Sequence, residues 1–333
     1  MILVTGGTGL VGAHLLYRLT ENKQQVRAIY RSEASLEKVK KVFSYYSQDA
    51  TTLFHTIDWV AADITDIPAL EEAFTGVTHV YHCAALISFD PKDYYTLKKI
   101  NVVGTRNLVN ISTHNGVQKF CYVSSIATIG KEVGSPTANE ESEWNNTHAN
   151  VYALTKYSAE MEVWRASQEG LKVVIVNPGV ILGPGFWEGS GTFFTTAAKG
   201  QRYYPPSGSG FVAVADVVSL MIMAMESDVV NERFITVVKN LSYKEALTSI
   251  ALALGKKAPS KQLPLWLLEL LWRLDWLATT VTGKKRKLSK NQVYGLREQK
   301  LYSNEKSRST FSFEYSDINT TITEVAKIYA QEH

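Results

Sequence analysis

The chain has 333 residues, 45% of them hydrophobic, and 35 Lys and Arg against 32 Asp and Glu give it a formal net charge of +3. This length is enough for one large core with an appended lobe, or for two ordinary domains. So small a net charge gives no electrostatic basis for a nucleic-acid partner, and the sequence therefore favours a globular protein that acts on small molecules.

The N-terminal run Met1–Val4 leads directly into a glycine-rich turn and lacks the charged and apolar regions of a secretory signal. The two cysteines, Cys83 and Cys121, each lie in an apolar, strand-like run, which is typical of reduced core thiols. The sequence contains no CxxC or HExxH motif. We therefore expect a cytoplasmic protein without a metal site.

Up to about residue 177, short β-branched runs alternate with helical stretches. This alternation predicts an α/β fold, in which a doubly wound parallel sheet is covered by helices on both faces. Six runs are predicted to be its strands: residues 2–5, 26–30, 57–61, 79–84, 120–124 and 173–177.

Beyond Asn177 the regular pattern gives way to stretches rich in Gly and Pro, which we interpret as a domain boundary. The run 234–238 is predicted to return to the sheet as a last strand. We expect a dinucleotide-binding domain formed by residues 1–177 and about 211–240, and a smaller, mostly helical C-terminal substrate lobe formed by about 178–210 and 241–333.

A glycine-rich loop follows the first strand directly and precedes an amphipathic helix. Gly6 would permit a tight turn, Gly9 would let the backbone approach a pyrophosphate, and Gly12 would let helix and strand pack closely. The free N–H groups at the start of the helix would then hold the diphosphate. The residues predicted to bind phosphate are Gly6, Thr8, Gly9, Leu10, Val11 and Gly12.

The spacing of these glycines is GxxGxxG within a stretch that begins TGGTG. It resembles the loop of the extended short-chain dehydrogenase/reductase family, also called the NAD-dependent epimerase/dehydratase superfamily, and the resemblance spans nearly the whole chain. It implies a Rossmann-type sheet and a nicotinamide dinucleotide cofactor.

The end of the second strand indicates which dinucleotide is preferred. NAD-binding members of such folds place a carboxylate there for the ribose 2′-hydroxyl, whereas this chain has Arg31 and Ser32. Arg31 could pair with a 2′-phosphate through charge-assisted hydrogen bonds, which favours NADP(H). The alternatives are that NAD(H) is also used and that Arg31 is simply a solvated residue at a strand end.

The resemblance implies further cofactor contacts. Asp63 and Ile64 are similar to the pair that contacts adenine, and Ala84 and Ala85 to the small residues that admit the dinucleotide over the fourth strand. Family members usually carry Asn before that Ala pair, and this chain departs from them with a cysteine. Matches to the family also occur at the following positions: Asn101 in the helix motif below the site, and Pro178 and Val180 in the segment along the nicotinamide.

Carbonyl reduction needs a proton donor beside the carbonyl oxygen, and a tyrosine with a lysine one helical turn away supplies one. The pattern YxxxK occurs four times: Tyr94/Lys98, Tyr95/Lys99, Tyr152/Lys156 and Tyr302/Lys306. Only Tyr152/Lys156 opens the helix after the fifth strand, where sheet ligands collect. The other three are interpreted as partly exposed pairs on helix surfaces.

In the family pattern, a serine at the end of the fifth strand orients the substrate oxygen. Counting back from Gly130 places this role on Ser125, with Ser124 as the fallback. The resulting hypothesis is hydride transfer between NADP(H) and a ketone or aldehyde, or the corresponding alcohol, with Tyr152 as general acid and Lys156 tuning it and binding the ribose.

The sequence is similar to dihydroflavonol-reductase-like and 3β-hydroxysteroid-dehydrogenase-like members, on motifs such as Val26–Arg31. The alternative is an NAD-dependent nucleotide-sugar epimerase or dehydratase. Dehydratases carry an Asp-Glu pair after the catalytic Ser/Thr, where this chain has Ile126 and Ala127. A non-catalytic dinucleotide-sensing protein would be expected to have lost the Tyr/Lys pair. Relatives often dimerise through the helices that hold Asn101 and Tyr152, so a homodimer is possible.

Residues 263–281 form an apolar stretch rich in Leu and Trp, and the basic run Lys284–Lys287 follows it. Three charges within the stretch argue against a transmembrane helix. We interpret it as a helix that caps the substrate cleft. The alternative is peripheral membrane contact through residues 263–287. Either interpretation predicts a hydrophobic substrate.

Overall fold

A computed structural model describes residues 1–130, 135 and 137–333. Its central sheet has seven parallel strands in the order β11-β7-β5-β4-β1-β2-β3. Their bounds are β1 (Ile2–Thr5), β2 (Val26–Tyr30), β3 (Asp58–Ala61), β4 (His79–His82), β5 (Lys119–Val123), β7 (Val173–Pro178) and β11 (Glu232–Thr236). The chain builds outward from β1 to β3 and then returns to place β4 on the other side of β1. The prediction of a doubly wound sheet with a late returning strand is confirmed.

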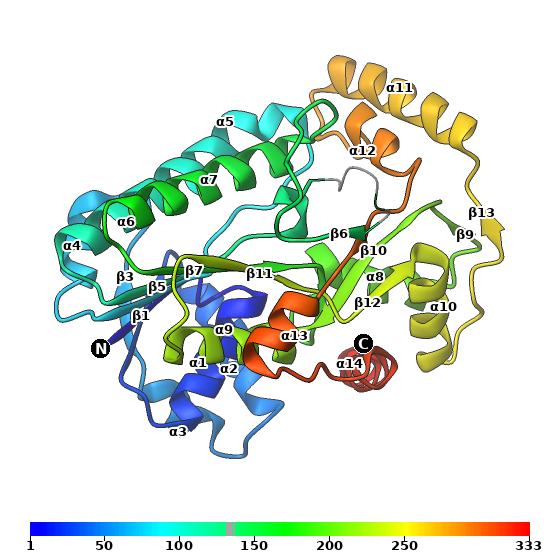
Figure 1. Ribbon diagram of the computed structural model, residues 1–333. Coiled ribbons are helices and arrows are strands. Elements are labelled where there is room, and N and C mark those ends of the chain that lie inside the picture. The colour runs from blue at the N-terminus through cyan, green and yellow to red at the C-terminus, as the bar shows by residue number, and fades with distance from the viewer. Residues whose placement is uncertain (131–134, 136) are drawn as a thin grey trace.

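Helices cover both faces of this sheet (Figure 1). Successive residues of a buried strand point to opposite faces, so Leu3 packs on one side and Val4 on the other. The helices on the Val4 side are α1 (Leu10–Glu21), α2 (Leu36–Ser44), α3 (Ala50–His55) and α9 (Val214–Glu226). Those on the Leu3 side are α4 (Ile67–Ala73), α6 (Gly104–His114) and α7 (Val151–Gln168). The reversal of strand order opens a crevice at the carboxyl ends of β1 and β4.

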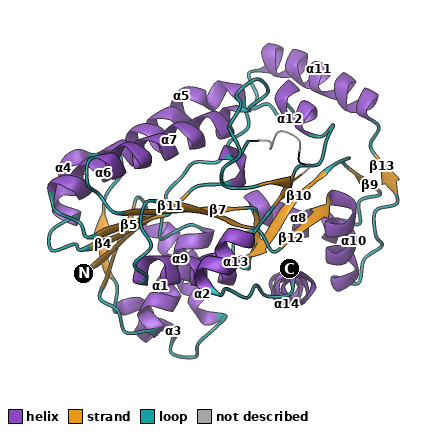
Figure 2. Ribbon diagram, viewed as in Figure 1, coloured by secondary structure: helices purple, strands orange, loops and turns teal. Residues whose placement is uncertain are grey.

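The C-terminal region is mixed rather than mostly helical, because short strands interleave with its helices (Figure 2). A three-stranded sheet is formed by β8 (Val180–Leu182), β10 (Gly208–Ala213) and β12 (Lys239–Ser242). The helices that share its core are α8 (Thr192–Ala198), α10 (Tyr243–Ala253) and α14 (Ile318–Glu332). Short strand pairs join distant segments: β9 (Tyr203–Tyr204) with β13 (Lys261–Gln262), and β6 (Thr137–Ala138) with β14 (Leu301–Tyr302).

The remaining helices lie outside the two sheets. They are α5 (Tyr94–Leu97), the π-helical turn η3 (Lys98–Val103), α11 (Leu265–Thr282), α12 (Lys290–Gly295) and α13 (Glu305–Phe311). Short 3₁₀ turns complete the described elements: η1 (Glu33–Ser35), η2 (Pro91–Asp93), η4 (Ile126–Thr128) and η5 (Gly189–Gly191). No helix of the described residues is long and apolar enough to cross a membrane.

Candidate active site

A groove of about 220 Å³ lies at the carboxyl ends of the first four strands. It brings together eight of the residues predicted to bind cofactor: Gly6, Thr8, Gly9, Arg31, Asp63, Ile64, Ala84 and Ala85. The sequence analysis had not selected six other lining residues: Ile29, Tyr30, Ala62, Cys83, Leu86 and Ile100. Most of these are apolar side chains next to a predicted contact, so proximity in the chain was the available signal.

The three glycines of the loop differ in how much room a side chain would have at each position. Gly6 has a positive φ of 70°, and a Cβ there would lie 2.4 Å from the backbone nitrogen of Ala84. A Cβ on Gly12 would lie 2.1 Å from the carbonyl oxygen of Gly6. At Gly9, which precedes α1, the nearest atom would be 3.4 Å away. The fold therefore requires Gly6 and Gly12, whereas Gly9 leaves open space at the helix N-terminus, where an anion fits.

Arg31 and Asp63 form the charged edge of the groove. The Arg31 side chain is 67% exposed, and its guanidinium lies 3.8 Å from an Asp63 carboxylate oxygen. Burial would raise the pKa of Asp63, but two hydrogen bonds from Thr65 and the nearby charge of Arg31 lower it below its usual value. Asp63 is thus a fixed anion, and Arg31 retains exposed donors. Ser32 is exposed and is not among the residues that line the groove.

Asn101 lies behind the groove, in the π-helical turn η3. Its buried side chain accepts a hydrogen bond from the Leu86 backbone nitrogen at 2.8 Å and donates to the Leu86 carbonyl at 3.0 Å. It also donates to the Thr155 hydroxyl on α7 at 3.3 Å. Asn101 therefore joins one wall of the groove to the helix that carries Tyr152.

The helix α7 begins where its sequence provides a cap. The Asn150 side chain accepts a hydrogen bond from the Ala153 backbone nitrogen at 2.9 Å. This start places Tyr152 in the first turn and Lys156 one turn later, as the position of the YxxxK pair predicted. Burial raises the pKa of Tyr152, and a side-chain hydrogen bond with Ser125 partly offsets that rise. The end of β5 and the start of α7 thus bring Ser125 and Tyr152 together.

Lys156 is almost completely buried beneath the tyrosine. Its ammonium donates to the Tyr122 hydroxyl at 2.7 Å and to the Val123 carbonyl at 2.8 Å, both on β5. Burial lowers the pKa of Lys156 to about 7, although the nearby Glu160 carboxylate opposes this shift. The lysine can therefore exchange a proton near neutral pH. Sequence analysis had not identified Tyr122 as its anchor.

A buried carboxylate, Glu160, supports the site from one helical turn farther along α7. It accepts hydrogen bonds from the hydroxyls of Ser124 at 2.5 Å and Thr128 at 2.8 Å. The Asn177 amide donates to it at 3.0 Å, and the Arg233 guanidinium lies 3.1 Å from its other oxygen. Glu160 was not predicted from the sequence, although its spacing from Tyr152 and Lys156 along one face of the helix was a signal for it.

Asn177 also fixes the position of the end of β7 and the start of β8. Its amide donates to the Ser125 carbonyl at 3.3 Å, so Pro178 and Val180 follow directly beside the site. Pro178 is buried and Val180 is half-buried. Neither Pro178 nor Val180 is among the residues that line the groove.

Two of the other YxxxK tyrosines are placed differently. Tyr95 is 81% exposed on α5. The interpretation of Tyr302/Lys306 as a pair on one helix surface is wrong: Tyr302 is buried in β14, whereas Lys306 lies in α13 and pairs with Glu232 at 2.6 Å. A short strand precedes the helix there, so the i,i+4 spacing does not span one helix.

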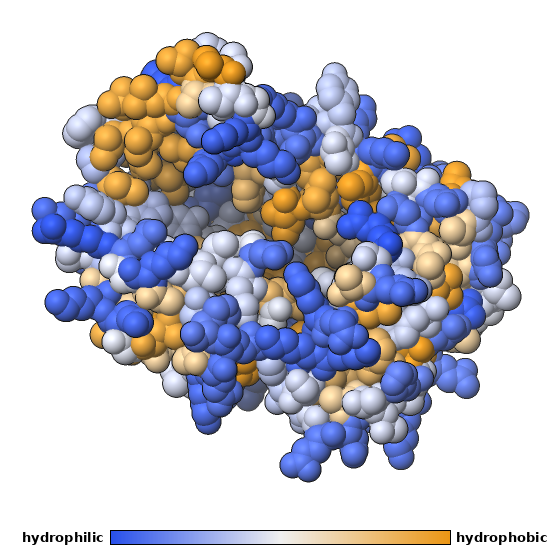
Figure 3. Space-filling model, turned by 180° about the vertical axis from the view of Figure 1, so that it is seen from behind, coloured by the Kyte–Doolittle hydropathy of each residue, from blue (hydrophilic) through white to orange (hydrophobic). Residues whose placement is uncertain are grey.

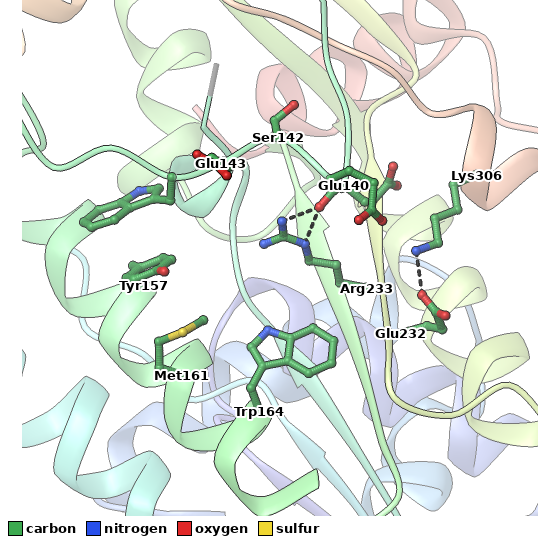
Figure 4. Close-up of a pocket in the computed structure, with 11 residues that line it drawn as sticks. Glu140, Ser142, Glu143, Tyr157, Met161, Trp164, Glu232, Arg233 and Lys306 are labelled. Carbon is green, nitrogen blue, oxygen red and sulfur yellow. Dashed lines mark hydrogen bonds and ion pairs between the residues drawn. The ribbon is translucent and has the colours of Figure 1, made fainter. Parts of the chain in front are cut away.

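A larger cavity, of about 580 Å³, lies between α7 and β11. Figure 4 shows Tyr157, Met161 and Trp164 on α7 lying opposite Arg233, whose guanidinium donates to the Glu140 carbonyl. None of the described residues lines both this cavity and the groove at the carboxyl ends of the first four strands. Because Arg233 also pairs with Glu160, the cavity adjoins the rear of the buried network.

Sequence comparison supplies independent findings. The family described as "NAD dependent epimerase/dehydratase family" matches residues 2–237. The "Putative dihydroflavonol 4-reductase" of Synechocystis is 31% identical over 274 residues, which cover 79% of this chain and 75% of that protein. The "Sterol demethylase protein B" of Methylococcus capsulatus is 28% identical over 268 residues, which cover 79% and 77%.

Structural comparison adds the UDP-glucose 4-epimerase of Thermotoga maritima. That structure has a TM-score of 0.78 and 20% sequence identity, and the match covers 99% of each chain. At this identity the likeness establishes the shared fold alone. The groove and the Ser125–Tyr152 contact both lie at the edge of the sheet formed by the carboxyl ends of its strands.

Proposed function

The chain belongs to the NAD-dependent epimerase/dehydratase family, and within it we propose that the protein is an NADPH-dependent reductase of a hydrophobic ketone or aldehyde, able also to oxidise the alcohol. The observation that carries the proposal is the contact between Ser125 and Tyr152, with Lys156 one helical turn below. A half-buried phenol that contacts a serine hydroxyl can give a proton to a carbonyl oxygen.

The groove fits a dinucleotide. Its floor is built of small residues, Gly6, Ala84 and Ala85, and the open space at Gly9 adjoins the N-terminus of α1. NADPH would supply the hydride when bound there. Thr8 and the first backbone N–H groups of α1 would hold its diphosphate.

The proton would come from this chain's own residues. Tyr152 would donate its phenolic proton to the substrate oxygen, and Ser125 would orient that oxygen by a hydrogen bond. Lys156, held by Tyr122 and the Val123 carbonyl, would place a positive charge next to the phenolate that remains. With a pKa near 7, Lys156 is also able to relay the replacement proton at neutral pH.

The preference for NADPH is supported by the charge at the end of β2. Arg31 is mostly exposed at the edge of the groove, and no carboxylate follows β2 directly to repel a 2′-phosphate. Asp63 lies farther along the groove and is already paired, loosely, with Arg31. A guanidinium with free donors suits a phosphate better than a hydroxyl.

An apolar substrate is supported by the residues around Tyr152. The Phe89 ring packs edge-on to the Tyr152 ring at a centroid distance of 5.7 Å, and both Ile87 and Phe89 are exposed near it. Relatives named for dihydroflavonol and sterol reactions agree with this chemistry. A nucleotide-sugar epimerase is the second candidate. It is favoured by the similarity to the "UDP-glucose 4-epimerase" of Vibrio cholerae, which is 27% identical over 288 residues.

The two candidates differ in substrate and cofactor. We expect NADPH consumption with one or more apolar ketones or aldehydes, at least about tenfold faster in kcat/KM than with NADH, since one lost charge-assisted contact is worth roughly 1.4 kcal/mol or more. Absorbance at the nicotinamide band measures this. Interconversion of UDP-sugars by enzyme carrying bound NAD, without turnover of any carbonyl on the panel, would favour the epimerase instead.

A further inference from the structure

The helix α11 carries an apolar stripe on the face that points away from the protein. The stripe consists of Trp266, Leu270, Leu274, Leu277 and Val281, all exposed, with Trp266 at 68% and Val281 at 78%. These residues recur every three or four positions, so they share one face of the helix. The only buried residues of α11 are Leu268 and Thr279, on the opposite face.

This arrangement reverses that of an ordinary surface helix, which turns its apolar stripe toward the core. Of the charged residues of α11, Glu269 and Arg273 lie along one flank of the stripe and pair with each other, whereas Asp275 lies toward the covered face. Glu269 accepts hydrogen bonds from Arg273 at 2.8 Å and from Arg297 at 3.0 Å. Asp275 accepts from the backbone nitrogen of Lys287 at 2.9 Å. An exposed apolar stripe with satisfied flanks marks an interaction surface.

Basic residues stand at the end of the same helix. Gly283, with a φ of 69°, terminates α11 and turns the chain into the basic segment 284–287. Lys284, Lys285 and Lys287 are exposed there, and Lys290 follows at the start of α12. An Asp93 carboxylate oxygen lies 3.9 Å from the Lys285 ammonium, and Asp90 and Asp275 accept hydrogen bonds from backbone nitrogens of the segment. The basic residues Lys284, Lys285, Arg286, Lys287 and Lys290 outnumber these carboxylates, so the cluster keeps a net positive charge.

We propose that the apolar stripe of α11 and the basic segment 284–287 dock this protein on the surface of an anionic lipid bilayer. An interfacial helix has an apolar face that enters the acyl boundary, a polar flank and basic residues that meet anionic headgroups, and α11 has all three. The charges of Glu269, Arg273 and Asp275 exclude an orientation in which α11 crosses the membrane. In agreement, no helix of the described residues, α11 included, is long and apolar enough to cross one. A second copy fits less well, because antiparallel two-fold pairing of α11 would put each basic segment beside the N-terminal turn of the other copy's α11, which has no acidic residue.

The docking surface lies beside the candidate active site. The Lys92 ammonium donates to the Thr279 carbonyl at 3.4 Å, and the Arg286 backbone nitrogen donates to Asp90 at 2.8 Å. These contacts fix α11 to the segment after β4 that carries Phe89 against Tyr152. In Figure 3, an apolar cluster at the upper left, where α11 lies, overhangs a hollow in the surface.

A bilayer against α11 would therefore lie near the exposed side chains of Ile87 and Phe89, the second of which contacts Tyr152, so an apolar substrate could enter from the lipid phase. This route rests on the proposed function, whereas the docking itself does not. The two can fail separately: loss of vesicle binding leaves turnover of a dissolved substrate intact, and loss of turnover leaves vesicle binding intact.

Vesicle flotation of the full chain tests the docking, with vesicles of phosphatidylcholine alone or mixed equally with phosphatidylglycerol. We expect the protein to float with the mixed vesicles, at least about tenfold more than with phosphatidylcholine. The triple variant Leu270→Gln, Leu274→Gln, Leu277→Gln removes the stripe and should abolish flotation. The matched control is Leu252→Gln on α10, an exposed leucine outside the surface, which should float like the wild type.

A second variant, with Lys284→Glu, Lys285→Glu and Lys287→Glu, should lose preference for anionic vesicles, and 0.5 M salt should have the same effect. Thermal melting confirms that each variant is folded. The proposal is overturned if the wild type does not float, or if the stripe variant floats like the wild type. It is also overturned if light scattering shows a dimer that the stripe variant abolishes while neither form floats, since the stripe would then join two copies.

Discussion

Replacing Glu160 by alanine tests whether the buried network beneath the site holds the fold together. The Glu160 carboxylate is inaccessible and serves the hydroxyls of Ser124 and Thr128, the Asn177 amide and the Arg233 guanidinium. Its removal would leave Arg233, whose side chain is only 17% exposed, without its counter-charge. The donors that converge on Glu160 would also lose their acceptor.

The expected cost follows from this burial. Removing one partner of a buried ion pair costs about 3–5 kcal/mol, because the remaining charge stays desolvated. In a chain of this length each kcal/mol lowers Tm by roughly 2 °C, so Tm should fall by about 6–10 °C. Glu160→Gln keeps an acceptor and should cost about half as much. The matched control is Glu169→Ala, which removes an exposed pair with Arg165 worth at most about 1 kcal/mol.

Thermal melting and urea titration of the three variants measure these differences. A second readout is the pKa of Lys156, which the Glu160 carboxylate holds up. In Glu160→Gln that pKa should fall below about 7, and the corresponding limb of the pH–rate profile should move to lower pH. If Glu160→Ala melts within about 2 °C of the wild type, like Glu169→Ala, the network does not stabilise the fold and the reasoning is refuted.

Three further outcomes are expected. Arg31→Ser should lower kcat/KM with NADPH by about 10–100-fold, because the 2′-phosphate loses a partner. The value of kcat/KM with NADH should stay within about twofold of the wild type, and an equal loss with NADPH and NADH would contradict the assignment of Arg31. Gly9→Ala should keep the wild-type Tm but lose NADPH affinity in a fluorescence titration. Gly12→Ala should unfold at lower temperature, since its Cβ would lie 2.1 Å from the Gly6 carbonyl oxygen. A lower Tm for Gly9→Ala together with an unchanged Tm for Gly12→Ala would refute the roles assigned to these two glycines. Burial lowers the pKa of His82 to about 3 and that of His14 to about 4, so the unfolded chain takes up protons below pH 6.5 that the folded chain does not. His82 should contribute roughly 1.4 kcal/mol per pH unit to the fall in unfolding free energy between about pH 6.5 and 4. His82→Asn should reduce the slope in urea titrations by that amount and leave the part due to His14; an unchanged slope would contradict it.

The features that sequence predicted are local ones. A glycine trio between a strand and a helix, or a tyrosine and a lysine at the start of α7, can be recognised from spacing alone. The position of Tyr152 after the fifth strand was enough to select it from four candidates, and the structure places it against Ser125.

The features that sequence did not predict depend on distant segments. Glu160 pairs with Arg233, which lies 73 residues farther along the sequence, and neither residue by itself indicates that it has a buried partner. Periodicity showed that the stretch at α11 is apolar, yet it could not show which face is covered. That depends on the packing of Leu268 and Thr279 against the rest of the chain. Tyr302 was misjudged because a two-residue strand carries no periodicity.

The central claim is that Tyr152 delivers the proton during NADPH-dependent carbonyl reduction. Its most direct test is turnover by Tyr152→Phe beside Tyr95→Phe, the exposed tyrosine of another YxxxK pair, with NADPH binding measured on the same samples. We expect Tyr152→Phe to bind NADPH like the wild type and to lose at least about 100-fold in kcat, the usual worth of a positioned acid, while Tyr95→Phe keeps full activity. Turnover by Tyr152→Phe at the wild-type rate would contradict the account.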